Sequence, residues 1–322
     1  MVSHSHNPID SYDVVIIGAG PAGIFAAYLA HIKGLTPLLV EATTNLGGQP
    51  QNLYSQKKIY DYPGFYGIKA YELINHFRKQ LHEHSPIKTL LQTTVASCRA
   101  HASGWMIGLS NQHEVFAKAI IIATGAGIFN PNKLTINVDQ SNHIHYAFDS
   151  LDHFRNKRVV ILGGGDAAVD WANELAENQI SNDVTIIHRR NEFRANGENV
   201  ARMQVNKIKV LLDYEIISIA NDKVDIKHNI THEVLHIPYQ VVLVQYGQSI
   251  NRNNLEPFKN VAVNSVGRIV VKINQMTSIE NIYAIGDVCI YEGKPSSLIC
   301  AHGEAAVAVR DIVNRIKQYD KK

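Results

Sequence analysis

Cysteine is scarce in this chain of 322 residues, which holds only Cys98, Cys289 and Cys300. No two of them are spaced C-x-x-C, so the sequence offers neither a zinc knuckle nor a dithiol redox motif, and we predict no metal site. Long apolar runs are also lacking, because no window approaches the length of a membrane span. The polar N-terminus shows no signal peptide. We therefore expect a cytoplasmic protein with no membrane partner.

Excess charge of one sign is absent too. Lysine and arginine total 31 residues and aspartate and glutamate total 29, which gives a net charge of +2. A balance this mild gives no reason to expect a nucleic-acid partner. Apolar residues make up 45% of the chain and charged residues 19%, so the chain can bury a sizeable core. At this length we expect two domains of ordinary size.

One pattern occurs twice in the chain. VVIIGAGPAGIFAAYLA stands at 14–30 and VVILGGGDAAVDWANEL at 159–175, each a β-branched run, then spaced glycines, then an apolar helical pattern. The copies start about 145 residues apart, which is too far for a solenoid repeat and fits two related α/β domains.

Other runs outline the rest of the fold. Apolar segments predict strands at 37–41, 119–125, 184–190, 208–219, 240–247, 268–271 and 281–287, and helical patterns occupy 70–84, 167–178 and 303–319. The segment 91–118 alternates apolar and polar residues and predicts a small antiparallel sheet. Loops rich in Asn and Pro at 126–133 and 247–257 are candidate domain crossings. They predict a discontinuous first domain, 1–126 and 247–322, and an inserted second domain, 127–246.

The first glycine loop carries Gly18, Gly20 and Gly23 in the spacing G-x-G-x-x-G. Gly18 permits a tight turn, Gly20 lets a pyrophosphate approach the backbone, and Gly23 allows close packing of strand and helix. The helix N-terminus then offers unpaired N–H groups to phosphates. Glu41 ends the next strand, where an acid accepts hydrogen bonds from ribose hydroxyls. Together these features predict dinucleotide binding.

The second glycine loop is followed by a strand with a different ending. The loop has Gly163, Gly165 and, in the third position, Ala168, which still permits close packing. The next strand ends in HRR at 188–190 rather than in an acid, and Arg194 comes shortly after it. An acid would repel a 2′-phosphate, whereas arginines bind it through charge-assisted bidentate hydrogen bonds. This loop is therefore expected to prefer NADP(H), unless the arginines form an ordinary solvated surface.

A third motif, AIGD at 284–287, places Gly286 and Asp287 at the end of a late strand, where an aspartate can bond the ribityl chain of a flavin. With GAGPAG at 18–23, GGGDAA at 163–168 and ATG at 123–125, the chain resembles the flavoprotein reductases that have two dinucleotide-binding domains, in their thioredoxin-reductase-like branch. The resemblance covers nearly the whole chain. It implies an α/β fold of two Rossmann-like, three-layer ββα domains, with FAD on the first loop and NADPH on the second, the NADPH domain being inserted in the FAD domain.

Thioredoxin reductases carry C-x-x-C shortly after the second glycine loop, where this chain has AAVDWA at 167–172. A dithiol relay at this place is excluded on chemistry. The segment LGGQPQNLYSQKKIYDYPG at 46–64 is instead similar to the dithiol-free ferredoxin (or flavodoxin)–NADP reductases of the same fold. That resemblance implies that Gln49 contacts the flavin, Tyr54 stacks on the isoalloxazine ring, Val95 touches the adenine side through its backbone, Phe129 lines the flavin pocket, and Asp287 holds the ribityl chain.

The resemblance implies two cofactor sites. The residues expected to bind FAD are Gly18, Gly20, Pro21, Ala22, Gly23, Glu41, Gly48, Gln49, Tyr54, Val95, Thr124, Gly125, Phe129, Gly286 and Asp287. Those expected to bind NADPH are Gly163, Gly165, Asp166, Ala167, His188, Arg189, Arg190 and Arg194. No side chain is expected to be catalytic, because the cofactor carries the chemistry and the protein supplies position and electrostatics.

The chain departs from these reductases after the last helix. They usually continue with an extension that covers one flavin face with an aromatic residue or a histidine, whereas this chain ends at Lys322. That face is expected to be open, or covered by another group such as one from a partner subunit. His302 is a candidate by position, although a lone histidine is more often structural. The last helix, expected to start near Gly303, would point its N-terminus at the N1/C2=O edge of the flavin.

The resemblance implies an FAD-dependent oxidoreductase that passes electrons between NADPH and ferredoxin or flavodoxin, with hydride transfer from nicotinamide C4 to flavin N5. The resemblance also implies a homodimer. Basic residues within 57–58, 155–158 and 317–322 offer a docking surface for an acidic ferredoxin, or are simply solvated. The alternatives are an NADPH-dependent disulfide or peroxide-system reductase that uses an external thiol, and a non-catalytic flavin- and NADP-binding regulatory protein.

Overall fold

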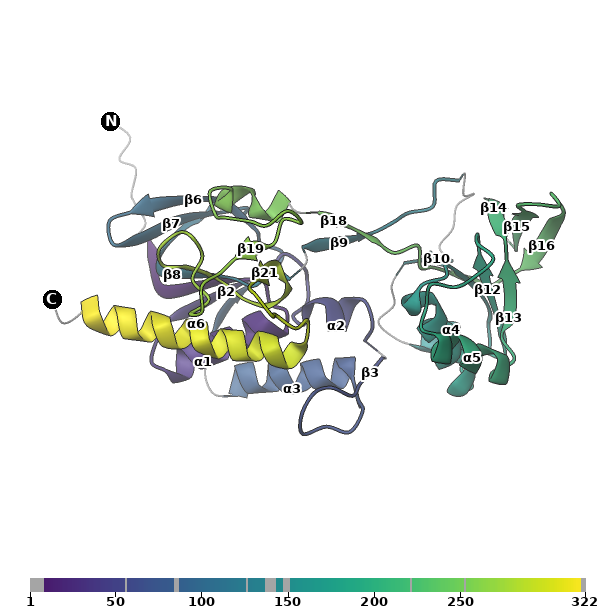
Figure 1. Ribbon diagram of the computed structural model, residues 1–322, viewed down its shortest axis with the longest axis horizontal. Helices are drawn as coiled ribbons and strands as arrows, with labels where there is room; N and C mark the ends of the chain where they lie inside the picture. Colours follow the sequence, from purple (N-terminus) through teal and green to yellow (C-terminus); the bar gives the residue numbers. More distant parts are fainter. Residues whose placement is uncertain are drawn as a thin grey trace, which may run out of the picture. The chain divides into compact units, whose positions relative to one another are not determined.

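The chain folds into two compact units (Figure 1). The computed structural model describes residues 9–55, 57–83, 87–125, 127–136, 143–146, 151–220, 222–251 and 253–319. The first unit comprises Met1–Gln51, Lys58–Ile128 and Ile250–Lys322, and the second comprises Asn52–Lys57 and Phe129–Ser249. The insertion begins at Phe129 and ends at Ser249, and both ends lie within the predicted crossings 126–133 and 247–257. The assignment of 52–57 to the second unit was not predicted.

The first unit is built on a mixed sheet in the order β5-β2-β1-β8-β7-β6, with β20 pairing with β8. Its strands are β1 (Asp10–Ile17), β2 (Pro37–Val40), β5 (Lys88–Leu90), β6 (Val95–His101), β7 (Gly104–Leu109), β8 (Glu114–Ile122) and β20 (Ile282–Ala284). Strand β1 is parallel to β2 and β8, whereas β7 is antiparallel to β6 and β8. The predicted antiparallel pairing within 91–118 is therefore confirmed, and it continues the main sheet rather than forming a separate one.

Helices cover one face of this sheet. Helix α1 (Pro21–Ile32) contacts both α3 (Ala70–Glu83) and α6 (Leu298–Tyr319), and the three run close together in Figure 1. The central strand is buried on both faces, since neighbouring Val14 and Val15 are both fully buried. This explains why β1 has a continuous apolar run instead of an alternating one.

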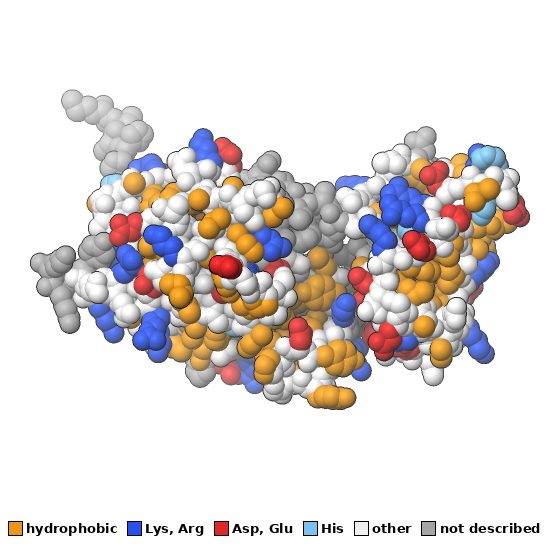
Figure 2. Space-filling model, in the orientation of Figure 1, with side chains coloured by type: hydrophobic (Ala, Val, Ile, Leu, Met, Phe, Trp, Pro, Cys, Tyr) orange, Lys and Arg blue, Asp and Glu red, His pale blue; other side chains and the backbone are white. Residues whose placement is uncertain are grey.

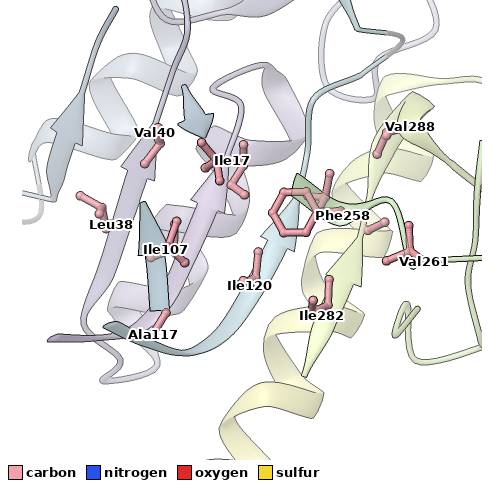
Figure 3. Packing of buried hydrophobic residues seen from close by; sticks show 14 of the residues in the cluster. Ile17, Leu38, Val40, Ile107, Ala117, Ile120, Phe258, Val261, Ile282 and Val288 are labelled. Atoms are coloured by element: carbon pink, nitrogen blue, oxygen red, sulfur yellow. The ribbon is translucent and has the colours of Figure 1, made fainter. Parts of the chain in front are cut away.

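The opposite face of the sheet packs on the segment that precedes α6. That segment holds η2 (Asn253–Phe258), β19 (Ile269–Val270), η3 (Gly286–Val288) and β21 (Cys289–Ile290). Figure 3 shows Phe258 and Val261 in one apolar cluster with Ile17, Ile120 and Ile282 of the sheet. The remaining elements of this region are α2 (Gly48–Asn52) and the antiparallel pair β3 (Lys58–Ile59) and β4 (Ile68–Lys69).

The second unit repeats this plan on a smaller scale. Its parallel sheet has the order β10-β17-β11-β12-β13, from β10 (Ile144–His145), β11 (Arg158–Leu162), β12 (Asp183–His188), β13 (Lys209–Leu212) and β17 (Val241–Val244). One face packs on η1 (Leu151–Phe154), α4 (Asp166–Glu177) and α5 (Gly197–Val205). The other face packs on the antiparallel sheet of β14 (Tyr214–Ile219), β15 (Lys223–His228) and β16 (Val234–Pro238). Each unit thus has the helix, sheet and β layers that were predicted.

The chain enters and leaves the inserted segment Phe129–Ser249 through two strands. Strands β9 (Ile128–Pro131) and β18 (Gln248–Asn251) fall within the predicted crossings 126–133 and 247–257, and they pair with each other as a two-stranded sheet. Within the described ranges, none of the helices combines the length and the hydropathy that a membrane crossing needs.

Two predicted elements are wrong in their bounds. The strand expected over 208–219 is interrupted at Asp213, whose φ of +61° turns the chain from β13 in the parallel sheet to β14 in the antiparallel one. The short polar side chain of aspartate tolerates this left-handed conformation. The last helix begins at Leu298, so Gly303 lies inside it. The expectation that the helix N-terminus is near Gly303 is therefore wrong.

Candidate functional site

The first glycine loop connects β1 to α1 through a backbone that only small residues allow. Gly18 has a φ of +101°, and a Cβ there would lie 2.5 Å from the carbonyl oxygen of Ala123. A Cβ on Gly23 would lie 1.9 Å from the carbonyl oxygen of Gly18. The glycines at these two positions therefore permit the turn itself and the close packing of α1 on it.

Gly20 has a different environment from the other two glycines. A Cβ there would meet nothing closer than 3.9 Å, where the Cα of Gly48 lies. Gly20 is the N-cap of α1 and has no side-chain cap, and Pro21 begins the helix. The loop thus leaves room beside backbone N–H groups at a helix N-terminus, which is the geometry that a pyrophosphate needs. The residues here fit the dinucleotide that the sequence predicts.

Glu41 comes directly after β2 and reaches back to this loop. Its Oε2 accepts a hydrogen bond from the N–H of Ala19 at 2.7 Å, and its Oε1 accepts from the N–H and the Oγ1 of Thr43, both at 2.8 Å. The side chain is buried. Glu41 therefore stabilises the loop itself, a role that the sequence did not reveal. Its contact with a ribose stays a prediction.

Two further predicted residues follow β8 at the same edge of the sheet. A Cβ on Gly18 would lie 3.1 Å from the Cα of Thr124, and a Cβ on Gly125 would lie 3.6 Å from Nε2 of Gln49. Thr124 Oγ1 is buried and has no hydrogen-bond partner among the described residues. Because buried hydroxyls are normally paired, this atom also fits a site that takes a polar ligand.

The third motif lies against the first loop, although it is distant in the sequence. Gly286 follows β20, and a Cβ on it would lie 3.4 Å from the Cβ of Ala22. Asp287 accepts a hydrogen bond from Ser296 Oγ at 3.2 Å. The structure therefore brings together the two loops that the sequence predicts for FAD, because β20 and β1 both pair with β8.

Three other predicted FAD residues are placed less directly. Val95 is buried in the apolar cluster of the first unit, so only its backbone is available for the predicted contact. Tyr54 is half-buried and lies in the segment 52–57 of the second unit. Phe129 lies in β9, and its side chain is outside the described part of the chain. The predicted roles of these three residues stay predictions.

His302 lies on α6 within a cluster of aromatic rings. Its Nδ1 is 2.9 Å from the hydroxyl of Tyr62, and its Nε2 is 3.2 Å from the carbonyl oxygen of Pro21. Burial lowers the pKa of this imidazole, so it is neutral and offers one donor and one acceptor. Nε2–H donates to Pro21, and Nδ1 accepts from Tyr62. These contacts give His302 a packing role, and its cover of a flavin face stays a prediction.

The second glycine loop connects β11 to α4. Gly163 has a φ of +150°, and a Cβ there would lie 2.3 Å from the carbonyl oxygen of Gln245. A Cβ on Gly165, the N-cap of α4, would meet nothing within 4 Å. In the third position Ala168 is fully buried. Asp166 accepts a hydrogen bond from the N–H of Asn196 at 2.9 Å, while Ala167 is exposed in the first turn of α4.

The arginine segment is anchored through its backbone. Arg194 N–H donates to the carbonyl oxygen of Gly164 at 2.8 Å, and the carbonyl oxygens of Arg189 and Arg190 accept from Asn229 and Asp213. The side chains of all three arginines are exposed. No carboxylate in the described part of the chain forms an ion pair with them. Figure 2 shows basic side chains gathered on the visible face of this unit. Exposed guanidinium groups beside a glycine loop fit a phosphate.

His188 ends β12 and packs on the second glycine loop. A Cβ on Gly164 would lie 2.4 Å from its ring, and the ring stacks on Phe193 with 5.8 Å between centroids. Burial and then the charges of the three arginines lower the pKa of His188, so the imidazole is neutral. Its Nε2 is buried without a hydrogen-bond partner among the described residues. This atom, like Thr124 Oγ1, fits a polar ligand.

The second unit has no cysteine. The three cysteines are free thiols and all belong to the first unit. Burial raises the pKa of Cys98 and of Cys289 to about 12, so both are poor nucleophiles. Within the described ranges no three His, Cys, Asp or Glu residues are grouped as a metal would require.

Comparison with known proteins gives the family of this chain. The model of the pyridine nucleotide-disulphide oxidoreductases matches residues 12–305. The chain belongs to this family. It is 38% identical over 316 residues to a curated ferredoxin–NADP reductase of Malacoplasma penetrans (96% of this chain, 98% of the relative). It is 35% identical to ferredoxin–NADP reductase 2 of Bacillus cytotoxicus (93% of this chain, 92% of the relative).

Solved structures of the family agree with the fold. The thioredoxin reductase of Lactococcus lactis has a TM-score of 0.72 at 27% identity and covers 95% of this chain and 99% of its own. The thioredoxin reductase of T. acidophilum has a TM-score of 0.75 at 24% identity and covers 95% of this chain and 98% of its own. The predicted fold class and the predicted resemblance to thioredoxin-reductase-like ferredoxin–NADP reductases are both confirmed.

Proposed function

We propose that this protein is a ferredoxin–NADP reductase that uses FAD to pass electrons between NADP(H) and ferredoxin or flavodoxin. The proposal is supported by curated relatives of that name over almost the whole chain. The structural observation that carries it is the contrast between the two glycine loops. One is held by a buried acid, and the other lies beside three exposed arginines in a unit with no cysteine.

The residues of the first unit would hold the flavin nucleotide. The N–H groups after Gly20 would bind the pyrophosphate, Thr124 would offer its hydroxyl, and Asp287 would bind the ribityl chain. The second loop would bind the pyrophosphate of NADPH, and Arg189, Arg190 and Arg194 would bind its 2′-phosphate. When bound, the flavin supplies the chemistry by accepting a hydride and releasing electrons one at a time. The protein contributes positions and charges, with no catalytic side chain.

A panel of electron donors and acceptors tests this function. We expect the purified protein to be yellow, to oxidise NADPH much faster than NADH, and to reduce ferredoxin or flavodoxin. Thioredoxin is the matched negative acceptor, because the second unit has no dithiol to reduce it. Reduction of thioredoxin, or equal use of NADH, would contradict the proposal. Gel filtration of the same preparation tests the homodimer that we also propose.

A further inference from the structure

A buried ion pair is hydrogen-bonded to the turn at Gly286 and Asp287. Glu304 on α6 and Lys294 in the preceding loop form this pair, and each side chain is only 3% exposed. Glu304 Oε2 also accepts a hydrogen bond from the N–H of Gly286 at 2.6 Å. Glu304 Oε1 accepts from the Tyr291 hydroxyl at 3.0 Å as well as from Lys294. One carboxylate thus holds the turn, the loop after the turn, and the helix.

The loop that contains Lys294 also contacts the second residue of the turn, Asp287. Ser296 Oγ donates to Asp287 Oδ1 at 3.2 Å, only two residues beyond Lys294. Gly286 itself has a φ of +72° and faces Ala22 of the first glycine loop. The ion pair therefore fixes the position of a turn that touches the first glycine loop directly. No motif in the sequence marks either Lys294 or Glu304.

Stability alone does not explain such a pair. Taking two charges out of water costs more than a good contact usually returns, and apolar residues of similar volume often stabilise a protein as well. What the pair supplies is a fixed geometry with no net charge. The Cys289 thiol and the Tyr291 hydroxyl beside it are neutral, because burial raises the pKa of both. Lys294 is thus the charge that balances Glu304.

We propose that Glu304 is a positioning residue for the flavin, acting through Gly286 and Asp287, and that Lys294 keeps this buried carboxylate from opposing the negative charge of reduced flavin. The proposal rests on the proposed function, in which the first unit binds FAD. Positioning acts through the hydrogen bond to Gly286. Charge balance acts at longer range, because an unpaired buried charge is poorly screened.

A charge cycle tests the charge balance through the flavin potential, and the affinity for FAD reports on positioning. The variants are Glu304→Gln, Lys294→Met and the double variant. The dissociation constant of FAD is measured on the apoprotein, and the midpoint potential of the flavin is measured on the FAD-loaded form. Glu304→Gln keeps an acceptor for Gly286 and leaves Lys294 unpaired, so the potential rises. Lys294→Met leaves the carboxylate unpaired, so the potential falls and FAD binds at least about tenfold more weakly. The double variant is neutral again, so its potential returns towards that of the unmodified protein.

Exposed ion pairs of the same unit provide matched controls. Glu280→Gln removes one of the two carboxylate partners of Arg315, and Lys259→Met removes the partner of Glu256, where Glu280, Lys259 and Glu256 are all exposed. Neither control should change FAD affinity or potential. If Lys294→Met does not fold, the test compares Glu304→Gln with the double variant. The double variant should have the lower flavin potential, because it lacks the unpaired charge of Lys294.

Two outcomes distinguish failure of the inference from failure of the function. An unmodified protein that binds FAD, together with variants of equal potential and equal FAD affinity, would overturn the role of Glu304 and Lys294 alone. An unmodified protein that binds no FAD would overturn the proposed function, and the inference with it.

Discussion

The two glycine loops share a backbone plan, but their supporting contacts run in opposite directions. In the first unit, Glu41 after the second strand reaches back and holds the N–H of Ala19 in the loop. In the second unit, Asp166 in the loop reaches out and holds the N–H of Asn196, beyond the second strand. Each loop is therefore supported by an acid. In the first unit the acid follows the second strand, and in the second unit it lies in the glycine loop itself.

With the nucleotides proposed above, this reversal would let the same fold favour FAD in one unit and NADP(H) in the other. An acid after the second strand suits a ribose and repels a 2′-phosphate. By moving the acid into the loop, the second unit keeps the support and leaves the position after the strand to Arg189 and Arg190. The comparison predicts that substitutions in the first loop lower both the free energy of unfolding and the binding of FAD. Substitutions after β12 in the second unit should change only the preference between NADPH and NADH.

The third position of the two loops gives the largest expected difference. A Cβ on Gly23 would lie 1.9 Å from a backbone oxygen, whereas the second loop already carries Ala168. Gly23→Ala should therefore lower the free energy of unfolding by about 3 kcal/mol or more and abolish FAD binding. The reciprocal Ala168→Gly should cost about 1 kcal/mol, from helix propensity, and leave NADPH binding intact. Urea unfolding and flavin absorbance measure both, and equal losses in the two variants would contradict the comparison.

The acid of the first unit gives the next largest effect. Glu41→Ala removes three hydrogen bonds to a buried carboxylate, so the free energy of unfolding should fall by about 2–3 kcal/mol. Arg189→Ala, at an exposed side chain in the second unit, should change it by less than about 0.5 kcal/mol. A Glu41→Ala protein as stable as Arg189→Ala would show that the carboxylate does not support the loop.

The arginines should affect nucleotide preference without affecting stability. Replacing both Arg189 and Arg190 by Ala should raise the KM for NADPH about 30-fold, or about 2 kcal/mol, since charge-assisted hydrogen bonds to the 2′-phosphate are lost. The KM for NADH, which lacks that phosphate, should stay nearly unchanged. Steady-state kinetics with both nucleotides decide the point, and a parallel rise for NADH would place the arginines elsewhere than at the 2′-phosphate.

Much of this comparison could be predicted from the sequence, and the limits have physical causes. Both glycine loops and the strands before them are apparent from local spacing and apolar runs, which act over a few residues. The contact of Glu41 with Ala19, the contact of Glu304 with Gly286 and the assignment of 52–57 depend on how separate segments pack in three dimensions, which no local pattern encodes. Asp213 was missed because one polar residue inside a β-forming segment does not by itself reveal a left-handed backbone.

The smallest expected effect concerns pH and the last residue of the second strand in each unit. That strand ends in His188 in the second unit and in Val40, just before Glu41, in the first. Burial lowers the pKa of the folded-state imidazole below its usual 6.5. Above that pH both folded and unfolded states are neutral, and the stability is fully present. As the pH falls below 6.5, the unfolded state binds a proton first, so stability is lost until the folded-state pKa is passed.

Replacing this histidine isolates its share of the pH dependence. His188→Leu should make the unfolding free energy fall less steeply between neutral and mildly acidic pH. Part of the fall should remain, because burial also lowers the pKa of His302. His113→Gln, at an exposed histidine of the first unit, is the control and should leave the slope unchanged. Unfolding free energies measured across this range, at constant ionic strength, give the slopes. An identical slope in His188→Leu and the unmodified protein would mean that the folded imidazole titrates normally, so its burial against Gly164 would not hold it neutral.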